Sequence, residues 1–269
     1  MDHLGDLAIV GVGNMGSAMV DGLLRAGVDP RTLVLVEASA ERREHLAAAY
    51  PAARIVASID AHDGAIDGAV VAVKPGDVDT ACTALAARGV RRVISIAAGV
   101  TLSRLQEHCG SDVAVVRAMP NTPAVVGKST TAMATSGNCV AADVGWARSI
   151  LLAIGVVVEL PESSIDAFTG LIGSGPAYVF YVAEALLDAA RAAGLPRPAD
   201  LVANLLVGAA ALVEREPDSP AELRRRVTSP NGTTAAGIAA LDDRDVHDAF
   251  IAAVERATAR SRELGSSPR

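Results

Sequence analysis

A glycine-rich turn near the N-terminus is the first segment with a recognisable chemistry. Gly11-Val12-Gly13-Asn14-Met15-Gly16 follows an apolar stretch and opens an amphipathic segment that runs to about Arg25. In a strand–turn–helix unit, the first glycine allows the tight turn, the second admits a pyrophosphate, and the third lets the helix pack on the strand. Free N–H groups at the helix start favour phosphate oxygens. The spacing predicts a dinucleotide site formed by Gly11, Gly13, Asn14, Met15 and Gly16; a glycine turn without a ligand is the alternative.

An acidic residue follows at the distance expected for a ribose contact. Glu37 lies 21 residues after Gly16, at the end of the next apolar stretch. A carboxylate there accepts hydrogen bonds from the adenosine ribose, which favours NAD. Ser39, Arg42 and Arg43 come directly after it and could instead hold the 2′-phosphate of NADP. The cofactor, NADP or NAD, therefore stays open, and Glu37 tilts the expectation towards NADH.

Two further apolar stretches end in residues that suit a ligand. They are followed by Ala72-Val73-Lys74-Pro75 and by Ala97-Ala98-Gly99. In a doubly wound sheet, ligands bind at the carboxyl ends of the strands, and small residues let a flat ring lie against the backbone. We therefore expect both segments to bind cofactor. Lys74 is one of only two lysines in the chain; its alternative role is that of a solvated surface residue.

The elements that must position these residues alternate between apolar strands and helices. Helical stretches such as Glu41–Tyr50 and Asp77–Arg88 separate the strands, which predicts a parallel sheet covered on both faces. Residues 1–161 are thus expected to form an NAD(P)-binding Rossmann-type doubly wound domain. The expected strands are Leu7–Val12, Leu33–Glu37, Ala69–Val73, Val93–Ala97 and Val113–Ala118, with Thr130–Ala134 and Val156–Leu160 as additional edge strands.

After Pro161 the pattern changes to helices only. Apolar residues from Tyr178 to Ala189 recur with the helical period, and Gly194 ends that run. The next stretch, Leu201–Val213, is apolar almost all round, which is typical of a helix buried on every side. A domain of about a hundred residues rarely buries such a helix alone. We therefore expect residues 162–269 to form an all-helical substrate and dimerisation domain.

Three more segments are too unusual to be spacers. In the last of them, Pro230 breaks a helix, Asn231-Gly232 turns the chain, and a new helix starts with Thr233 or Thr234 as its cap. A helix start with free N–H groups suits a carboxylate. The segments are Arg117-Ala118-Met119-Pro120-Asn121-Thr122-Pro123, Gly173-Ser174-Gly175-Pro176-Ala177-Tyr178 and Thr228-Ser229-Pro230-Asn231-Gly232-Thr233-Thr234.

Taken together, these segments resemble the pyrroline-5-carboxylate reductase family, from Ile9 to about Leu264. They are far more specific to the family than the glycine turn is. The chain departs from the family at Asn231, where glycine is usual, and at Glu37, where the family has an uncharged or basic residue. Asparagine tolerates the left-handed conformation, so the turn should survive. The departure at Glu37 affects only the cofactor preference.

The resemblance implies an oxidoreductase that reduces 1-pyrroline-5-carboxylate to L-proline with NAD(P)H, the last step of proline biosynthesis, without a metal. It implies that Ser229 and the backbone N–H groups of Gly232, Thr233 and Thr234 bind the substrate. The Thr234 hydroxyl would be the catalytic group, in contact with the ring nitrogen as proton relay or binding group; a mere helix cap is the alternative. Asn121 would lie near the nicotinamide. A homodimer, and a ring of five dimers, are also implied.

Composition argues against other classes of function. Acidic residues outnumber basic ones, 31 to 24, and only 3% of residues are aromatic, so neither a basic face nor stacking rings are available for nucleic acid. Cys82, Cys109 and Cys139 fit neither a disulfide framework nor a zinc knuckle, and the histidines are scattered. We see no signal peptide and no apolar run long enough for a bilayer, and expect a cytoplasmic protein without metal or membrane partner.

Two rival functions remain. A β-hydroxyacid dehydrogenase has the same two-domain plan but needs a lysine in its helical domain, and no lysine follows Lys128. A catalytically silent NAD(P)-binding sensor or scaffold would keep the glycine turn without needing the Thr228–Thr234 segment.

Overall fold

The computed structural model describes residues 4–216 and 219–266, which divide into two compact units. The sheet unit comprises Met1–Gly173 with Ala257–Arg269, and the helical unit comprises Ser174–Arg256. This division by contacts falls later than the domain boundary expected after residue 161, because Ile165 is buried together with Ala132 and Ala134 of the sheet. The sequence boundary stays a prediction.

The sheet unit is built on eight strands in the order β3-β2-β1-β4-β5-β6-β7-β8. The first six are parallel to one another, β7 is antiparallel to β6, and β8 is parallel to β7. The order of the parallel strands is that of a doubly wound dinucleotide-binding sheet. Their bounds are β1 (Leu7–Val10), β2 (Leu33–Val36), β3 (Arg54–Val56), β4 (Gly68–Val71), β5 (Arg92–Ser95), β6 (Ala114–Met119), β7 (Ser129–Thr135) and β8 (Gly155–Glu159).

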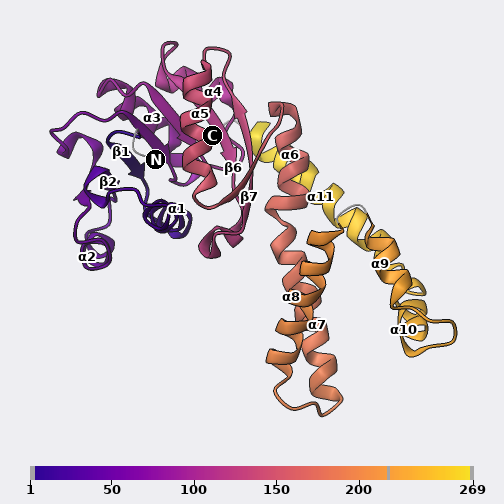
Figure 1. Ribbon diagram of the computed structural model, residues 1–269. Helices are drawn as coiled ribbons and strands as arrows, with labels where there is room; N and C mark the ends of the chain where they lie inside the picture. Colours follow the sequence, from indigo (N-terminus) through magenta and orange to yellow (C-terminus); the bar gives the residue numbers. More distant parts are fainter. Residues whose placement is uncertain (1–3, 217–218, 267–269) are drawn as a thin grey trace. The chain divides into compact units, whose positions relative to one another are not determined.

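Helices cover both faces of this sheet (Figure 1). Because side chains alternate along a strand, Leu7 and Ile9 of β1 face one core while Ala8 and Val10 face the other. The first core contains residues of α1 (Asn14–Arg25), α2 (Ala40–Ala49) and α5 (Ala141–Leu152), and the second those of α3 (Val78–Ala87) and α4 (Leu102–Cys109). The predicted doubly wound fold is confirmed.

Two details of the sheet differ from the sequence-based expectation. The short strand β3 was not predicted, because three half-buried residues are too few to show an apolar alternation. β7 lies inside the sheet, between β6 and β8, and not at its edge. It is antiparallel because the short connection from β6, which contains the 3-10 helix η4 (Thr122–Val126), cannot make the crossover that a parallel pair requires.

Every described element after β8 is helical. Leaving the sheet, the chain forms η5 (Glu162–Ser164), α6 (Ile165–Phe168) and a π-helical turn, η6 (Thr169–Gly173). The helical unit then begins with two antiparallel helices, α7 (Gly175–Ala192) and α8 (Pro198–Arg215), which pack side by side. It continues with α9 (Pro220–Arg226), α10 (Thr233–Asp242) and most of α11 (Val246–Ser266), whose end returns to the sheet unit.

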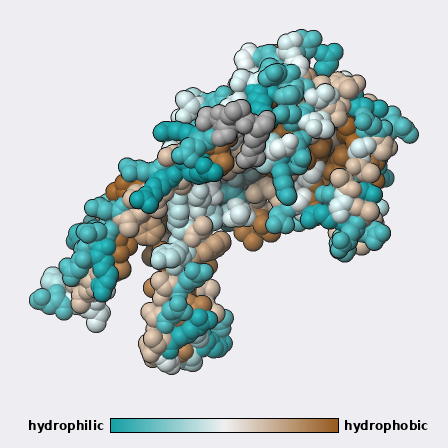
Figure 2. Space-filling model, turned by 180° about the vertical axis from the view of Figure 1, so that it is seen from behind, coloured by the Kyte–Doolittle hydropathy of each residue, from teal (hydrophilic) through white to brown (hydrophobic). Residues whose placement is uncertain are grey.

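The helical unit has almost no interior of its own. Among its described residues, only Ala190 and Val202 are buried. The apolar residues of α8 are exposed in the single chain, with Leu205 at 57% and Val207 at 70%. Apolar surface is accordingly visible on the helical segments in Figure 2. The helical unit by itself therefore does not supply the burial that the sequence predicts for Leu201–Val213.

One helical stretch among the described residues, Glu162–Ala192, is long and apolar enough to cross a membrane, and only 6% of its apolar window is buried. The sequence-based expectation concerned unbroken apolar runs, and this stretch is not one, since it contains Asp166, Glu184 and Asp188.

Candidate functional site

A cavity of about 730 Å³ lies at the edge of the sheet where β1, β2 and β4 end. The strand order reverses at β1, since β2 lies on one side of it and β4 on the other. Ligands of doubly wound sheets bind at this switch point. The lining includes six of the predicted cofactor residues, namely Gly11, Gly13, Glu37, Ala72, Val73 and Lys74.

The glycine turn has the geometry that a pyrophosphate requires. Gly11 has a φ of +88°, and a Cβ there would lie 2.9 Å from the backbone of Val73, so only glycine fits. A Cβ on Gly16 would collide with the carbonyl oxygen of Gly11, so this glycine is needed for close packing of α1. At Gly13, in contrast, a Cβ would meet nothing within 4 Å. The space in front of Gly13 is an open cradle at the start of α1, which fits a phosphate group of a dinucleotide.

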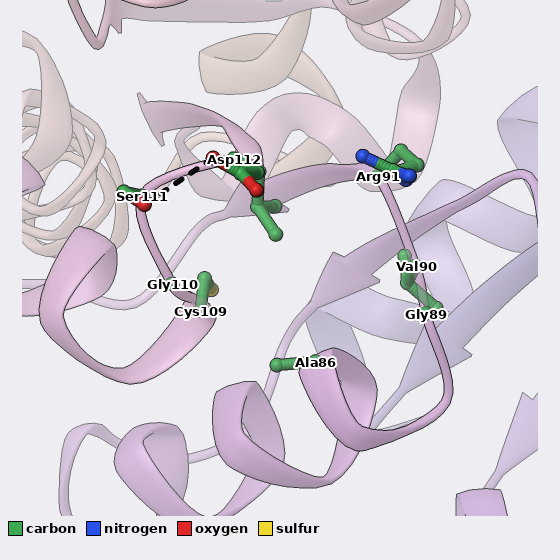
Figure 3. A pocket seen from close by; sticks show the side chains of 9 residues that line it. Ala86, Gly89, Val90, Arg91, Cys109, Gly110, Ser111 and Asp112 are labelled. Carbon is green, nitrogen blue, oxygen red and sulfur yellow. Dashed lines mark hydrogen bonds between the residues drawn. The ribbon is translucent and has the colours of Figure 1, made fainter.

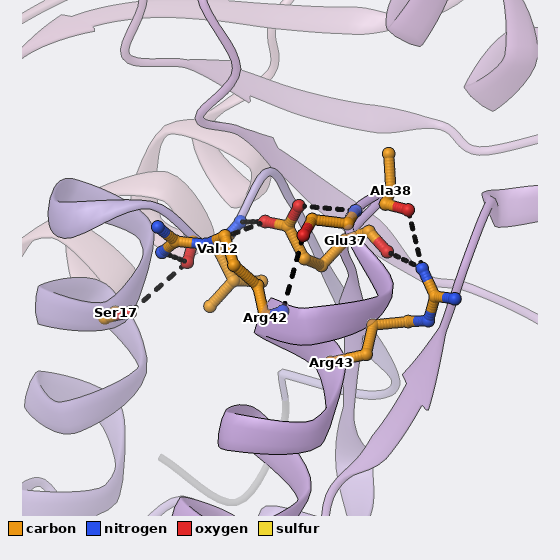
Figure 4. A network of polar contacts seen from close by, with 7 residues as sticks. Val12, Ser17, Glu37, Ala38, Arg42 and Arg43 are labelled. Carbon is orange, nitrogen blue, oxygen red and sulfur yellow. Dashed lines mark hydrogen bonds and ion pairs between the residues drawn. The ribbon is translucent and has the colours of Figure 1, made fainter.

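Glu37 belongs to the same cavity and is held in place by backbone donors (Figure 4). Its side chain is 13% exposed. The N–H of Val12, inside the glycine turn, donates to Oε2 at 3.3 Å, and the N–H of Ser39 donates to Oε1 at 3.0 Å. The carboxylate therefore stands beside the phosphate cradle at the end of β2, the position from which an acidic residue reaches a ribose.

The two arginines that follow Glu37 are already engaged. Arg42 donates from Nη2 to the carbonyl oxygen of Val12 at 2.6 Å and pairs with the Glu37 carboxylate, Nε to Oε2, at 3.6 Å. Arg43 donates from Nη1 to the carbonyl oxygens of Glu37 and Ala38, at 2.9 and 2.7 Å. Of the two, only Arg42 lines the cavity. A 2′-phosphate would have to compete with these contacts and with the charge of Glu37.

The remaining predicted cofactor residues lie near the cavity without lining it. Asn14, Met15 and Gly16 form the first turn of α1, and Pro75 begins the 3-10 helix η3 (Pro75–Asp77). Ala97, Ala98 and Gly99 follow β5 at the same edge of the sheet. A Cβ on Gly99 would lie 3.4 Å from the carbonyl carbon of Leu264, so this loop contacts the end of α11. Their roles as cofactor ligands stay predictions.

The side chain of Asn121 is committed to the protein itself. Its Oδ1 accepts the N–H of Thr130 at 3.0 Å, and its Nδ2 donates to the carbonyl oxygen of Ile172 at 3.0 Å. Asn121 is buried. Its amide therefore braces the π-helical turn η6 against β7. Its backbone is engaged as well, because its N–H donates to Ser129 Oγ at 3.2 Å and its carbonyl oxygen accepts the N–H of Ala124 at 3.1 Å. The nicotinamide contact that the family resemblance implies stays a prediction.

Several cavity residues were missed by the sequence analysis. Four of them, from Ala57 to Asp60, follow β3, one is Asp77 of η3, and four lie along α3; the rest, Val10, Val36 and Ala38, are at the ends of β1 and β2. The loop after β3 would have been found if that strand had been recognised, because the carboxyl ends of parallel strands share one edge. The α3 residues are Thr80, Ala81, Ala84 and Leu85.

A second hollow lies at the opposite edge of the sheet (Figure 3). It measures about 370 Å³ and is lined by residues that precede β5 and β6, among them Arg91, Cys109 and Asp112. Because ligands of such sheets bind beyond the carboxyl ends of the strands, this hollow is not the dinucleotide site. The buried thiols of Cys82 and Cys109 share a hydrogen bond, which raises the pKa of Cys82 and lowers the pKa of Cys109.

Within the parts of the chain that the structure describes, no group of three or more His, Cys, Asp or Glu side chains could hold a metal ion. All three cysteines are free thiols.

The predicted substrate turn lies in the helical unit, between α9 and α10. Asn231 adopts the left-handed conformation, with a φ of +58°, as predicted from its residue type. The expectation that Thr233 or Thr234 caps the helix was wrong, because Gly232 occupies the N-cap position of α10 and no side chain caps it. The N–H of Gly232 donates to the carbonyl oxygen of Ser229 at 3.0 Å. The amides of Thr233 and Thr234, in the first turn of α10, lack intrahelical acceptors and point towards solvent-exposed space.

Comparisons with known proteins agree over nearly the whole chain. Residues 162–264 match the family described as pyrroline-5-carboxylate reductase dimerisation, and residues 6–99 match that of NADP oxidoreductase, coenzyme F420-dependent. The pyrroline-5-carboxylate reductase of Synechocystis is 40% identical over 265 residues, which cover 96% of this chain and 98% of the relative.

Solved structures show the same similarity. A pyrroline-5-carboxylate reductase from Coxiella burnetii superposes with a TM-score of 0.89 at 31% identity, covering 98% of this chain and 100% of the other. The Plasmodium falciparum pyrroline carboxylate reductase, solved with NADP bound, gives a TM-score of 0.87 at 28% identity, covering 99% of this chain and 100% of the other.

The open cradle at Gly13 yields the first testable prediction. In Gly13→Ala the added methyl group meets no protein atom, so the thermal midpoint should stay within about 2 °C. The methyl group would occupy the space of the pyrophosphate, so the Kd for NAD(P)H should rise about tenfold or more, equivalent to about 1.4 kcal/mol. Fluorescence titration measures the Kd. Gly145→Ala, at another open glycine, is the control; equal cofactor affinity in both variants would contradict the assignment.

Proposed function

The chain belongs to the pyrroline-5-carboxylate reductase family, and on that basis we propose that it reduces 1-pyrroline-5-carboxylate to L-proline with NAD(P)H, the last step of proline biosynthesis. The observation that carries the proposal is full-length similarity to such a reductase, 40% identity over 96% of the chain, combined with a phosphate cradle at Gly13. The absence of any lysine after Lys128 argues against a β-hydroxyacid dehydrogenase.

The backbone supplies most of the binding groups in this proposal. The cradle at Gly13 and the N–H groups at the start of α1 hold the pyrophosphate, and Ala72 and Val73 give the cofactor a flat, small-residue wall. The bound nicotinamide is the source of the hydride that reduces the C=N bond of the substrate. Because the protonated imine is already electrophilic, catalysis consists mainly of orientation and electrostatic stabilisation.

The start of α10 is the proposed substrate-binding segment. The amides of Thr233 and Thr234 stand at the positive end of the helix dipole and suit the substrate carboxylate. The amide of Gly232 is bonded to Ser229, so it would have to leave that acceptor to take part. Since the Thr234 side chain does not cap the helix, its hydroxyl is free for the ring nitrogen, as binding group or proton relay. Ser229 completes the turn.

We also propose that NADH is preferred to NADPH. The Glu37 carboxylate, held by the amides of Val12 and Ser39, accepts the adenosine ribose hydroxyls. A 2′-phosphate in the same place would face that negative charge, and Arg42 is already paired with Glu37 and the carbonyl of Val12.

The exposed apolar faces of the helical unit support the proposal that the chain forms a homodimer. Residues 162–264 match the family described as pyrroline-5-carboxylate reductase dimerisation. With only Ala190 and Val202 buried among its described residues, this unit cannot be stable alone. A second copy would cover Val207 and its neighbours, and dimers could assemble further into a ring of five. The same coverage explains the apolar stretch Glu162–Ala192 without a membrane, which fits a cytoplasmic enzyme.

Thr234 tests the proposed reaction. Wild-type enzyme should oxidise NAD(P)H, followed at 340 nm, only when pyrroline-5-carboxylate is added. Thr234→Ala should lower kcat/KM for this substrate about tenfold or more, the value of a lost hydrogen bond to a charged group, without changing the Kd for NAD(P)H. Thr234→Ser keeps the hydroxyl and should retain most activity. Unaltered kinetics in Thr234→Ala would remove Thr234 from the mechanism, and an inactive wild type would refute the function.

Glu37 tests the cofactor preference. Glu37→Gln removes the negative charge from the ribose pocket. The ratio of kcat/KM for NADPH to kcat/KM for NADH should therefore rise about tenfold, equivalent to about 1.4 kcal/mol. Glu41→Gln, at an exposed carboxylate in α2, is the matched control and should leave the ratio unchanged. The ribose assignment fails if the two variants give the same ratio.

The dimer interface can be tested by light scattering. Val207→Glu places a charge on the exposed apolar face of α8, which a partner would have to bury at high cost. The variant should therefore run with the 27.4 kDa mass of one chain, while the wild type runs as a dimer or larger assembly. Val140→Glu, on an exposed valine of the sheet unit, should assemble normally. A wild type that is monomeric at micromolar concentration contradicts the proposal.

A further inference from the structure

Arg117 is the charged residue of the Arg117–Pro123 segment, and neither the fold nor the proposed reaction accounts for it. It lies on β6, and its side chain is only 6% exposed. Its Nη1 donates to Glu162 Oε1 at 2.9 Å, and its Nη2 lies 4.0 Å from Asp166 Oδ1. The buried guanidinium of Arg117 is thus neutralised by two carboxylates, both from the segment that follows the last strand, β8.

Each carboxylate has a second partner on a different element. Glu162 Oε1 also accepts the backbone N–H of Leu102 at 2.7 Å, at the start of α4. Asp166 Oδ1 accepts the hydroxyl of Ser261 at 2.7 Å, and Ser261, in α11, is itself buried. Five elements, β6, η5, α6, α4 and α11, are therefore joined in one network around a buried guanidinium.

The two outer partners flank the points at which the chain leaves and re-enters the sheet unit. Asp166 lies seven residues before the exit at Gly173, and Ser261 lies four residues after the return at Ala257. The end of β6 and the residues after it also contact the segment in which the chain leaves the sheet unit. A Cβ on Gly173 would lie 3.2 Å from Cε of Met119, and Asn121 Nδ2 donates to the carbonyl oxygen of Ile172. The strand that carries Arg117 thus contacts the exit segment directly and is linked to the returning helix through Asp166.

We propose that Arg117 is a positioning residue for catalysis: through Glu162, Asp166 and Ser261 it orders the two chain segments from which the helical unit, with the substrate-binding start of α10, continues. This inference rests on the proposed function. Cofactor binding does not depend on Arg117, since the cavity at Gly13 and Glu37 is formed by other residues. Loss of the network should therefore affect substrate turnover and leave NAD(P)H binding intact.

The residue type agrees with a geometric role. A buried ion pair contributes little net stability compared with apolar packing, but it restricts the arrangement of its partners. Arginine presents donors in a rigid fork and can engage two carboxylates at once, whereas lysine offers a compact charge on a flexible stem. Arg117→Lys therefore keeps the charge and removes the defined geometry.

The experiment compares Arg117→Lys with Arg148→Lys in the full-length enzyme. Arg148 makes an ion pair with Glu159 of the same sheet at 2.8 Å, but both side chains are about half exposed. Arg117→Lys should lower kcat for pyrroline-5-carboxylate about tenfold to a hundredfold, the effect of a displacement of about 1 Å at a reacting centre. Its Kd for NAD(P)H should stay within about twofold of wild type, and Arg148→Lys should change neither value.

A second variant covers the case in which Arg117→Lys does not fold. Ser261→Ala removes only the hydrogen bond to Asp166 and should lower kcat about threefold, with unchanged NAD(P)H affinity. If both variants fold, the double variant should lose less than the product of the two single effects, because they share one network. A folded Arg117→Lys or Ser261→Ala with wild-type kcat would overturn the proposal, as would a parallel loss of NAD(P)H binding. Turnover by the wild type under the same conditions tests the reaction separately.

Discussion

The shortage of buried apolar surface in the helical unit is the constraint on which the rest of the molecule depends. Ala190 and Val202 are its only buried apolar residues among those described, while Leu205, Val207 and many others face outward. Helices with such faces are stable only when another surface covers them. The proposed substrate turn at Thr233–Thr234 belongs to this unit, so its stability depends on whatever surface covers these faces.

The sheet unit has ample buried apolar surface, because helices cover both faces of its sheet. It can therefore hold a ligand site with backbone atoms alone. Gly11 and Gly16 bring strand and helix into contact, and Gly13 leaves room for a phosphate. Glu37 is fixed by two amides and not by a side-chain partner of matching strength. A site made from backbone donors depends little on the side chains around it.

Buried polar side chains hold the segments through which the chain leaves and re-enters the sheet unit. Arg117, Asn121 and Ser261 lie where the chain passes between the units, and each is satisfied by partners on a different element. An unpaired polar group at such a depth would be costly, so the partners must keep one arrangement. The π-helical turn before Gly173 is held in the same way, by the amide of Asn121.

The sequence by itself determined the doubly wound sheet, the glycine turn, the position of Glu37 and the left-handed Asn231, because these follow from local periodicity and residue type. It did not reveal β3, and with it the loop at Ser58, because three half-buried residues carry no periodic signal. Only the tertiary structure decided that Gly232 caps α10, that the amide of Asn121 is occupied, and that Arg117 meets Glu162 and Asp166. These contacts join residues far apart in the chain, and their geometry depends on how whole elements pack.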